Sequence, residues 1–338
     1  MIQRDLFGYP ILPKIDILRI PYMGSKNSIA IMLFKRMLDL KPQAKYFVDL
    51  FGGGGSMAFT AHQIGLKVIY NEKQTSLVNF IKYIFDRIKK GERGKYGLFP
   101  DDFYKFITRE EFKKLKDEDS IKGQFARICY SFGNNQNGYL FGDIEKTRHL
   151  AHNFVMFQCE DSLKEFNELH KVNFTLPLSK NWNERRMEYK KDWNLHMKIK
   201  DCLKLEMLEQ LERLERLELL QQLEQLQQLE QLQRLEQLEQ LDNIKLLNLD
   251  YKDVIIDTPP EETIVYLDAP YRGTSKYIEG KDINYEELDN YFRNSPYTCF
   301  MSEYNAPFES VMEIEKRSLL NNSSDSKKYT LEQLYINN

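Results

Sequence analysis

A carboxylate, a proline and an aromatic ring follow a short apolar run in the C-terminal third of the sequence. The run is Ile264-Val-Tyr-Leu267, and the tetrapeptide is Asp268-Ala-Pro-Tyr271. At the end of a buried strand, these groups would offer a hydrogen-bond acceptor for an exocyclic amino group and a flat face for stacking a base. The amino nitrogen of adenine is a poor nucleophile, and hydrogen bonds from its N–H groups to Asp268 and to a backbone carbonyl would return electron density to it. A strand that simply ends in a proline turn is the alternative.

A glycine run follows a second predicted strand, near the N-terminus. Residues 46–50 are apolar apart from Tyr46 and Asp49, and they lead into Phe51-Gly-Gly-Gly-Gly-Ser56. Glycines let the backbone approach a ligand closely at the carboxyl end of a parallel sheet. The run has neither the lysine of a phosphate-binding loop nor the spacing of a dinucleotide fingerprint. A cofactor without phosphates therefore fits better, and a flexible turn is the alternative.

An acidic residue ends the next predicted strand. Residues 67–70 form the strand, and Asn71-Glu72 follow it. An acid at this position of an α/β fold can accept hydrogen bonds from a ribose diol. The alternative is an exposed glutamate that starts a helix, where the helix dipole favours negative charge.

The elements around these peptides alternate between strand and helix. Apolar periodicity predicts helices over 28–38, 57–64 and 75–89, and further strands over 244–249, 264–267, 297–302 and 331–336. Strand, turn, helix, strand, acid and helix is the pattern of an α/β fold with a parallel sheet.

The middle of the chain departs from that pattern. Residues 91–202 are polar, aromatic and rich in turns, with helices expected over 108–116 and 122–130. This composition predicts an inserted, mainly helical subdomain whose loops could carry recognition. Basic Lys180, Arg185 and Arg186 are interleaved with aromatic residues, which suits contact with DNA phosphates; a solvated helix face is the alternative.

An asparagine-rich loop in the same region has side chains that can read base edges. The candidates are Asn134 and Asn135. Amide groups bind adenine through paired donor and acceptor atoms. An ordinary polar loop is the alternative.

Thirteen leucines stand at a strict period of three from Leu205 to Leu241. Leu, Glu, Gln and Arg favour helix, so a long helical insertion is predicted over 203–242. Each step of three residues turns an α-helix by about 300°, and the leucine stripe therefore winds around it without forming a heptad seam. An architectural role is the simplest interpretation, and self-association through the repeat is the second.

Bulk composition excludes several classes of protein. The net charge is −3, of which the ten acidic and four basic residues over 203–242 contribute −6, leaving +3 for the rest of the chain. A local basic groove is therefore compatible with the acidic total. The four cysteines form no C-x-x-C pair, so no metal site is expected, and a reducing cytoplasm is favoured. No apolar run is long enough for a membrane span.

Taken together and in this order, the peptides resemble those of the Dam-type (D12 class) DNA adenine-N6 methyltransferases. Residues Tyr22-Met-Gly-Ser-Lys26 are similar to the family's N-terminal cofactor motif, and 47–56 are similar to its glycine-rich motif. Asp268-Ala-Pro-Tyr271 resembles its catalytic Asp-Pro-Pro-Tyr. The resemblance covers 18–90 and 244–305, with the recognition region between them.

The resemblance implies a fold, a reaction and a set of site residues. The fold would be a Rossmann-like methyltransferase sheet formed by 18–90 and 244–338, with a target-recognition subdomain over 91–202. The cofactor would be S-adenosylmethionine, in contact with Tyr22, Lys26, Asp49, Phe51, Gly52, Gly54, Glu72, Asp250, Tyr251 and Asp268. The partner would be double-stranded DNA, with its target adenine held by Asp268, Ala269, Pro270 and Tyr271. A cognate restriction endonuclease is a further partner that the family allows.

One position departs from the family's catalytic motif. Ala269 replaces the first proline, which removes stiffness but keeps the backbone carbonyl. Activity is therefore expected, although three alternatives remain open. They are a cytosine-N4 enzyme, an RNA methyltransferase and a catalytically silent binding homologue that uses the repeat.

Overall fold

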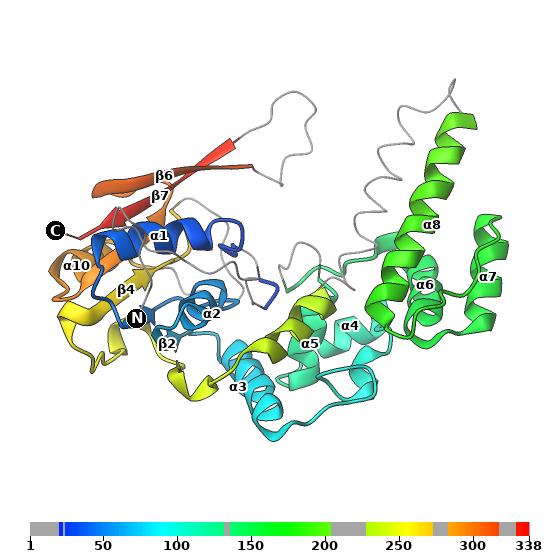
Figure 1. Cartoon of the computed structure of the whole chain (residues 1–338), viewed down its shortest axis with the longest axis horizontal. Helices are drawn as coiled ribbons and strands as arrows, with labels where there is room; N and C mark the ends of the chain where they lie inside the picture. Colours follow the sequence, from blue (N-terminus) through cyan, green and yellow to red (C-terminus); the bar gives the residue numbers. More distant parts are fainter. Residues whose placement is uncertain are drawn as a thin grey trace, which may run out of the picture. The chain divides into compact units, whose positions relative to one another are not determined.

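The chain forms two compact units, seen in a computed structural model that describes residues 20–22, 24–131, 136–203, 228–272, 283–317 and 329–337. The first, here called the sheet unit, combines 1–85 with 237–338 (Figure 1). The second, the helical unit, comprises 86–236. None of the described helices is long and apolar enough to cross a lipid bilayer.

Within its described residues, the sheet unit contains one seven-stranded sheet in the order β3-β2-β1-β4-β5-β7-β6. The five strands from β3 to β5 are parallel, whereas β7 runs antiparallel to β5 and β6. The predicted α/β class is confirmed, because this mixed, mostly parallel sheet is Rossmann-like. The strands are β1 (Tyr46–Asp49), β2 (Lys67–Asn71), β3 (Ile244–Leu247), β4 (Thr263–Leu267), β5 (Thr298–Glu303), β6 (Glu309–Arg317) and β7 (Tyr329–Ile336).

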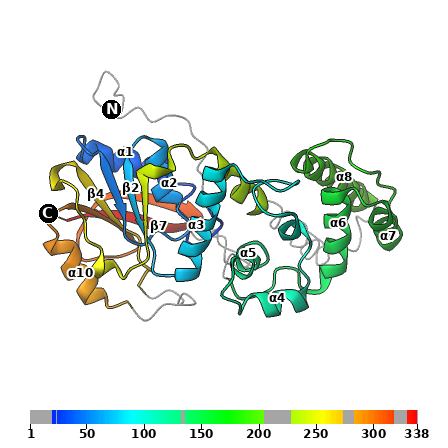
Figure 2. The ribbon, with the colours of Figure 1, turned by 90° about the horizontal axis from the view of Figure 1, so that it is seen from below.

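Helices cover both faces of this sheet. Successive residues of a strand point to opposite faces. Phe47 of β1 therefore packs against Phe34 of α1 (Ala30–Leu40), with ring centroids 5.0 Å apart, while Val48 joins a buried cluster with Leu288 of α10 (Tyr285–Asn294). Figure 2 shows α10 across the sheet from α1 and α2 (Ser56–Gln63). Helix α3 (Thr75–Lys90) follows β2, as the periodicity predicted.

Two details of the sheet differ from the sequence-based prediction. The strand predicted over 244–249 ends at Leu247, because the Asn248 amide turns away to donate to the carbonyl of Glu72, 2.8 Å away. Strand β6 was not predicted, since its alternation of polar and apolar residues is weak. It pairs with β7 along most of its length.

The helical unit consists of helices that pack around buried aromatic side chains. Its helices are α4 (Arg109–Leu115), α5 (Ile121–Cys129), α6 (Glu145–Phe157), α7 (Glu160–His170) and α8 (Trp182–Leu203). Thr108 and Glu111 form a reciprocal capping box at the start of α4, and Ser120 caps α5. The two helices predicted in this region, over 108–116 and 122–130, are thereby confirmed.

The end of the leucine repeat is not the continuous helix that was predicted. Residues 228–234 are helical, but a 3₁₀ turn covers Leu235–Gln237, and 238–240 are irregular before a second 3₁₀ turn over Leu241–Asn243. Leu229, Leu232 and Leu235 are all buried. A period of three keeps leucines on one face for only about two turns of α-helix, so the helix must end for later leucines to stay inside. Residues 204–227 lie outside the described part.

Candidate active site

The glycine turn after β1 is packed too tightly for side chains. A Cβ atom on Gly52 would lie 2.1 Å from the Tyr70 ring, and one on Gly54 would lie 2.3 Å from the Ile20 carbonyl oxygen. The Ile20 N–H donates to the Gly54 carbonyl at 2.7 Å, and the Gly52 N–H donates to the Asn71 carbonyl at 2.8 Å. The glycines therefore let the end of β2 and the N-terminal segment approach the turn closely.

Glu72 ties the end of β2 to the glycine turn. Its carboxylate accepts hydrogen bonds from the backbone N–H of Gly53 at 2.9 Å and of Gln74 at 2.8 Å. The Tyr22 hydroxyl donates to the Gln74 side chain at 3.3 Å. Three elements predicted to contact the cofactor thus meet at the carboxyl ends of β1 and β2.

Asp49 is a buried acid at the last position of β1. It is 1% exposed, and its Oδ1 has no hydrogen-bond partner among the described residues. Burial raises the pKa of Asp49 well above its usual range, and the charges of Asp268 and Glu72 raise it further. An unpartnered carboxylate oxygen in such a place favours a cationic or hydrogen-donating ligand.

An aromatic pair and an ion pair link the segments that follow β1, β2 and β3. The rings of Phe51 and Tyr251 lie 5.2 Å apart, and Asp250 pairs with Lys73 at 2.7 Å. Burial opposes ionisation of Asp250, but the hydrogen bond from Lys73 and the Lys252 N–H together lower its pKa below the usual value. The pair of rings offers apolar surface next to two ionised groups.

The Asp268-Ala-Pro-Tyr271 peptide contacts the N-terminal motif directly. Lys26 Nζ lies 2.7 Å from a carboxylate oxygen of Asp268 and 4.8 Å from the centre of the Tyr271 ring. The Tyr285 hydroxyl donates to the Pro270 carbonyl at 2.9 Å, which fixes the loop after β4. Ala269 is buried, 6% exposed, at the position where the family has proline.

One residue of this cluster was not predicted from the sequence. Glu332 of β7 is 1% exposed, lies 3.2 Å from Lys26 Nζ and accepts a hydrogen bond from the Tyr271 hydroxyl. Burial opposes protonation of Lys26, yet Asp268 and Glu332 together raise its pKa above the ordinary value. Glu332 is the one acid in β7, and no local motif marks it as part of a site.

Of the described residues predicted to bind DNA, Lys180 is exposed and both arginines are buried. Asn134 and Asn135 lie outside the described residues. Arg185 is buried and donates to the backbone carbonyls of Val155, Met156, Ser179 and Lys180, and Arg186 is buried against Glu230. A phosphate contact through either arginine would break these bonds, so the structure corrects the prediction for both: they hold α8 in the helical unit.

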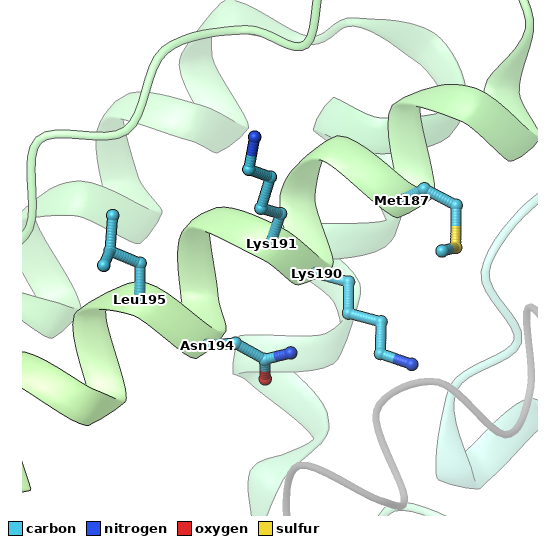
Figure 3. Close-up of a pocket in the computed structure, with 5 residues that line it drawn as sticks. All are labelled: Met187, Lys190, Lys191, Asn194 and Leu195. Carbon is cyan, nitrogen blue, oxygen red and sulfur yellow. The ribbon is translucent and has the colours of Figure 1, made fainter.

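The exposed side of α8 carries other basic groups. An open hollow there is lined by Met187, Lys190, Lys191, Asn194 and Leu195 (Figure 3). The side chains of Lys190 and Lys191 project from α8 in different directions. This hollow belongs to the helical unit and contains none of the predicted cofactor or catalytic residues.

Fold and site geometry are consistent with a Rossmann-like methyltransferase: a mostly parallel sheet whose carboxyl edge gathers a glycine turn, the acid Glu72 and an Asp-Ala-Pro-Tyr peptide. Comparison with known proteins identifies the family. The sequence model of the D12 class N6 adenine-specific DNA methyltransferases matches residues 22–212, more than half of the chain. The chain belongs to this family, and its activity is the N6 methylation of adenine in DNA. None of the curated proteins compared with the chain matches it.

The family match confirms the resemblance, the reaction and DNA as the substrate. It supports none of the alternatives, namely a cytosine-N4 enzyme, an RNA enzyme or a silent homologue. The match begins at Tyr22 and ends at residue 212, before the tetrapeptide that starts with Asp268. The roles of individual residues are therefore proposals that rest on the geometry of the site.

Proposed function

We propose that this chain transfers a methyl group from S-adenosylmethionine to N6 of an adenine that is flipped out of double-stranded DNA. The observation that carries the proposal is the ion pair between Lys26 and Asp268. It joins the N-terminal cofactor motif to the Asp-Ala-Pro-Tyr peptide at one edge of the sheet. Cofactor and target base would therefore share a single site.

The residues present suit this cofactor. S-adenosylmethionine supplies an electrophilic methyl group on a positively charged sulfur, with a ribose diol and an adenine nearby. Glu72 would accept from the ribose, and Phe51 with Tyr251 would pack on the adenine. The unpartnered Oδ1 of Asp49 would face a positively charged or hydrogen-donating part of the molecule. Tyr22, Lys26, Gly52, Gly54, Asp250 and Asp268 complete the proposed contacts.

The tetrapeptide would hold the target adenine. Asp268 and the backbone carbonyl of Ala269 would accept hydrogen bonds from the N6 amino group, and Tyr271 would stack on the ring. A stacked adenine cannot place N6 against a sulfonium at the sheet edge, so the base must leave the helix. Positioning and electrostatic stabilisation then account for the rate, because the residues of the site hold the nitrogen in line with the methyl group.

DNA recognition is proposed for the helical unit. Exposed Lys180, together with Lys190 and Lys191 on the free side of α8, suits contact with phosphates. Asn134 and Asn135 remain predictions for base reading. A cognate restriction endonuclease and self-association through the repeat also remain predictions.

The test is expression of the chain in cells that lack adenine methylation, followed by sequencing of their DNA with detection of modified bases. We expect N6-methyladenine in one short motif with the wild type and none with Asp268→Ala. Asp257→Ala is the matched control, since Asp257 is an exposed acid of the sheet unit. Full methylation by Asp268→Ala would overturn the assignment of the catalytic residue.

A further inference from the structure

We propose that Glu332 is a positioning residue for methyl transfer, acting through Lys26 and Tyr271. The inference rests on the proposed function of the Asp268 site. Glu332 lies outside every motif of that site in the sequence, on the strand next to the C-terminus. Its carboxylate nevertheless contacts both the lysine that pairs with Asp268 and the tyrosine proposed to stack on the base.

The register of the sheet explains how this glutamate reaches the site. Asp49 is paired with Tyr266, and Tyr266 is paired with Phe300, so these residues share one face. Ser302, two residues after Phe300, lies on the same face and is paired with Leu334 of β7. Glu332 is two residues before Leu334, and the alternation of a strand therefore returns it to the face that carries Asp49.

Three acceptor groups surround the ammonium group of Lys26. Three N–H donors are available. They face Asp268 at 2.7 Å, Glu332 at 3.2 Å and the Gly24 carbonyl at 3.4 Å. Removing Glu332 would leave the ammonium free to move toward Asp268, because one of the two carboxylates that hold it would be gone.

The same oxygen of Glu332 fixes Tyr271. The Tyr271 hydroxyl donates to Oε1, the atom that also faces Lys26. The hydroxyl is the far end of the ring, so this bond sets the orientation of the face offered to a base. A Tyr304 ring stands edge-on to it, with centroids 4.5 Å apart.

If Glu332 had a purely structural role, its contacts would serve mainly to stabilise the fold. A buried ion pair is weak evidence for stability, since desolvation of the charges offsets much of their attraction. Among the residues that the structure describes, the Glu332 carboxylate contacts Lys26 and Tyr271, and both belong to the proposed active site. The placement therefore favours a contribution to geometry at the site over a contribution to the fold.

The test is Glu332→Gln, which keeps size and an acceptor oxygen but removes the charge. Glu315→Gln is the matched control, because Glu315 is an exposed acid on the neighbouring strand β6, paired with Leu331. We expect kcat to fall about 10- to 100-fold for Glu332→Gln, with a melting temperature close to that of the control. The control variant should keep wild-type kcat.

A second readout does not depend on activity. Acetylation of lysines by a soluble reagent, followed by mass spectrometry, measures how accessible and how basic each amine is. Lys26 should react several-fold faster in Glu332→Gln than in the wild type, relative to exposed Lys252. This result is independent of whether the wild type methylates DNA, so a failure of the proposed function is distinguished from a failure of the Glu332 assignment.

Tyr271→Phe keeps the proposal testable if Glu332→Gln does not fold. It keeps the ring but removes the hydroxyl that Glu332 accepts, and we expect it to lower kcat about 10-fold. If both variants fold, their combined loss should be smaller than the product of the two. Wild-type kcat together with unchanged Lys26 labelling in Glu332→Gln would overturn the proposal, and so would wild-type kcat in Tyr271→Phe.

Discussion

Lys26 and Asp268 lie far apart in the sequence, yet a buried ammonium group and a partly exposed carboxylate from them form an ion pair at 2.7 Å. The lysine belongs to the segment before α1 and the aspartate follows β4. Parallel pairing of β1 with β4 places Asp268 at the carboxyl edge of the sheet, and the Lys26 N–H donates to Ser56 Oγ after the glycine turn, which holds the N-terminal segment at the same edge. This pair is the physical link between the cofactor motif and the tetrapeptide proposed to hold the base.

Replacing Lys26 by methionine should therefore damage both stability and activity. The variant leaves the buried carboxylate of Glu332 and the partly exposed carboxylate of Asp268 without a cation. Breaking a fully buried pair in this way costs about 3–5 kcal/mol, which is the upper bound expected here. Urea denaturation against Lys35→Met, a nearby exposed lysine, would measure the loss in the free energy of unfolding. A stability equal to that of the control would show that the pair contributes nothing.

The pH dependence of this contribution has a definite sign. The pKa of Lys26 is raised in the folded state above the ordinary 10.5. Stability from the charged lysine is then fully present below the unfolded pKa and is lost only as pH rises through the higher folded pKa. The difference between wild type and Lys26→Met should consequently stay constant from pH 7 to pH 9.

Glu72→Ala should weaken cofactor binding. The variant removes a carboxylate proposed to accept from the ribose, and it also frees the N–H groups of Gly53 and Gln74. Losing a hydrogen bond to a charged group costs about 1.5–3 kcal/mol of binding free energy, which corresponds to a Kd raised roughly 10- to 150-fold. Calorimetric titration with S-adenosylmethionine would measure it, with exposed Glu261→Ala as the control. An unchanged Kd would remove Glu72 from the site.

The sequence allowed the sheet and the N-terminal half of the site to be predicted because local patterns mark them. A strand that ends in Asp49 and continues into a glycine run is typical of an α/β fold with a parallel sheet. The same holds for the acid after β2 and for the tetrapeptide after β4. Parallel strands then bring these ends together without further information.

Other parts could not be predicted because they depend on contacts between distant segments. Glu332 reaches the site only through the pairing of β5 with β7. Arg185 looks like a DNA contact beside its aromatic neighbours, yet four carbonyl groups of the helical unit accept its N–H bonds. A charged residue's role follows from its partners, which sequence spacing does not reveal.

Leu232→Ala should destabilise the helical unit. Leu232 is fully buried, and the helix that carries it also holds Gln233, whose amide donates to the Tyr96 carbonyl at 2.9 Å. Removing a buried leucine side chain costs about 2–5 kcal/mol. Thermal unfolding followed by circular dichroism would show this loss against Gln237→Ala, an exposed position of the same repeat. If both variants melt together, the end of the repeat is not part of the core.

Asp49→Asn should change stability and cofactor binding in opposite directions. The folded-state pKa of Asp49 is raised because burial and the charges of Asp268 and Glu72 disfavour its ionised form. The folded state is therefore favoured when the group is neutral, and that advantage is lost as pH rises from the ordinary value of 3.8 through the folded pKa. An asparagine stays neutral, so the variant should melt higher than wild type at pH 8, with a smaller gain at pH 5.

The same change should weaken S-adenosylmethionine binding at pH 8, because a neutral amide replaces the acid whose Oδ1 is unpartnered. A gain in stability together with a loss of binding is expected where a site keeps a group that destabilises the fold but binds the ligand. Melting curves at both pH values and calorimetry at pH 8 would measure the two effects on one preparation. A variant that gains stability and binds the cofactor as tightly as the wild type would show that Asp49 does not contact it. A variant that loses stability at pH 8 would show that the buried carboxyl is held by bonds stronger than its desolvation cost.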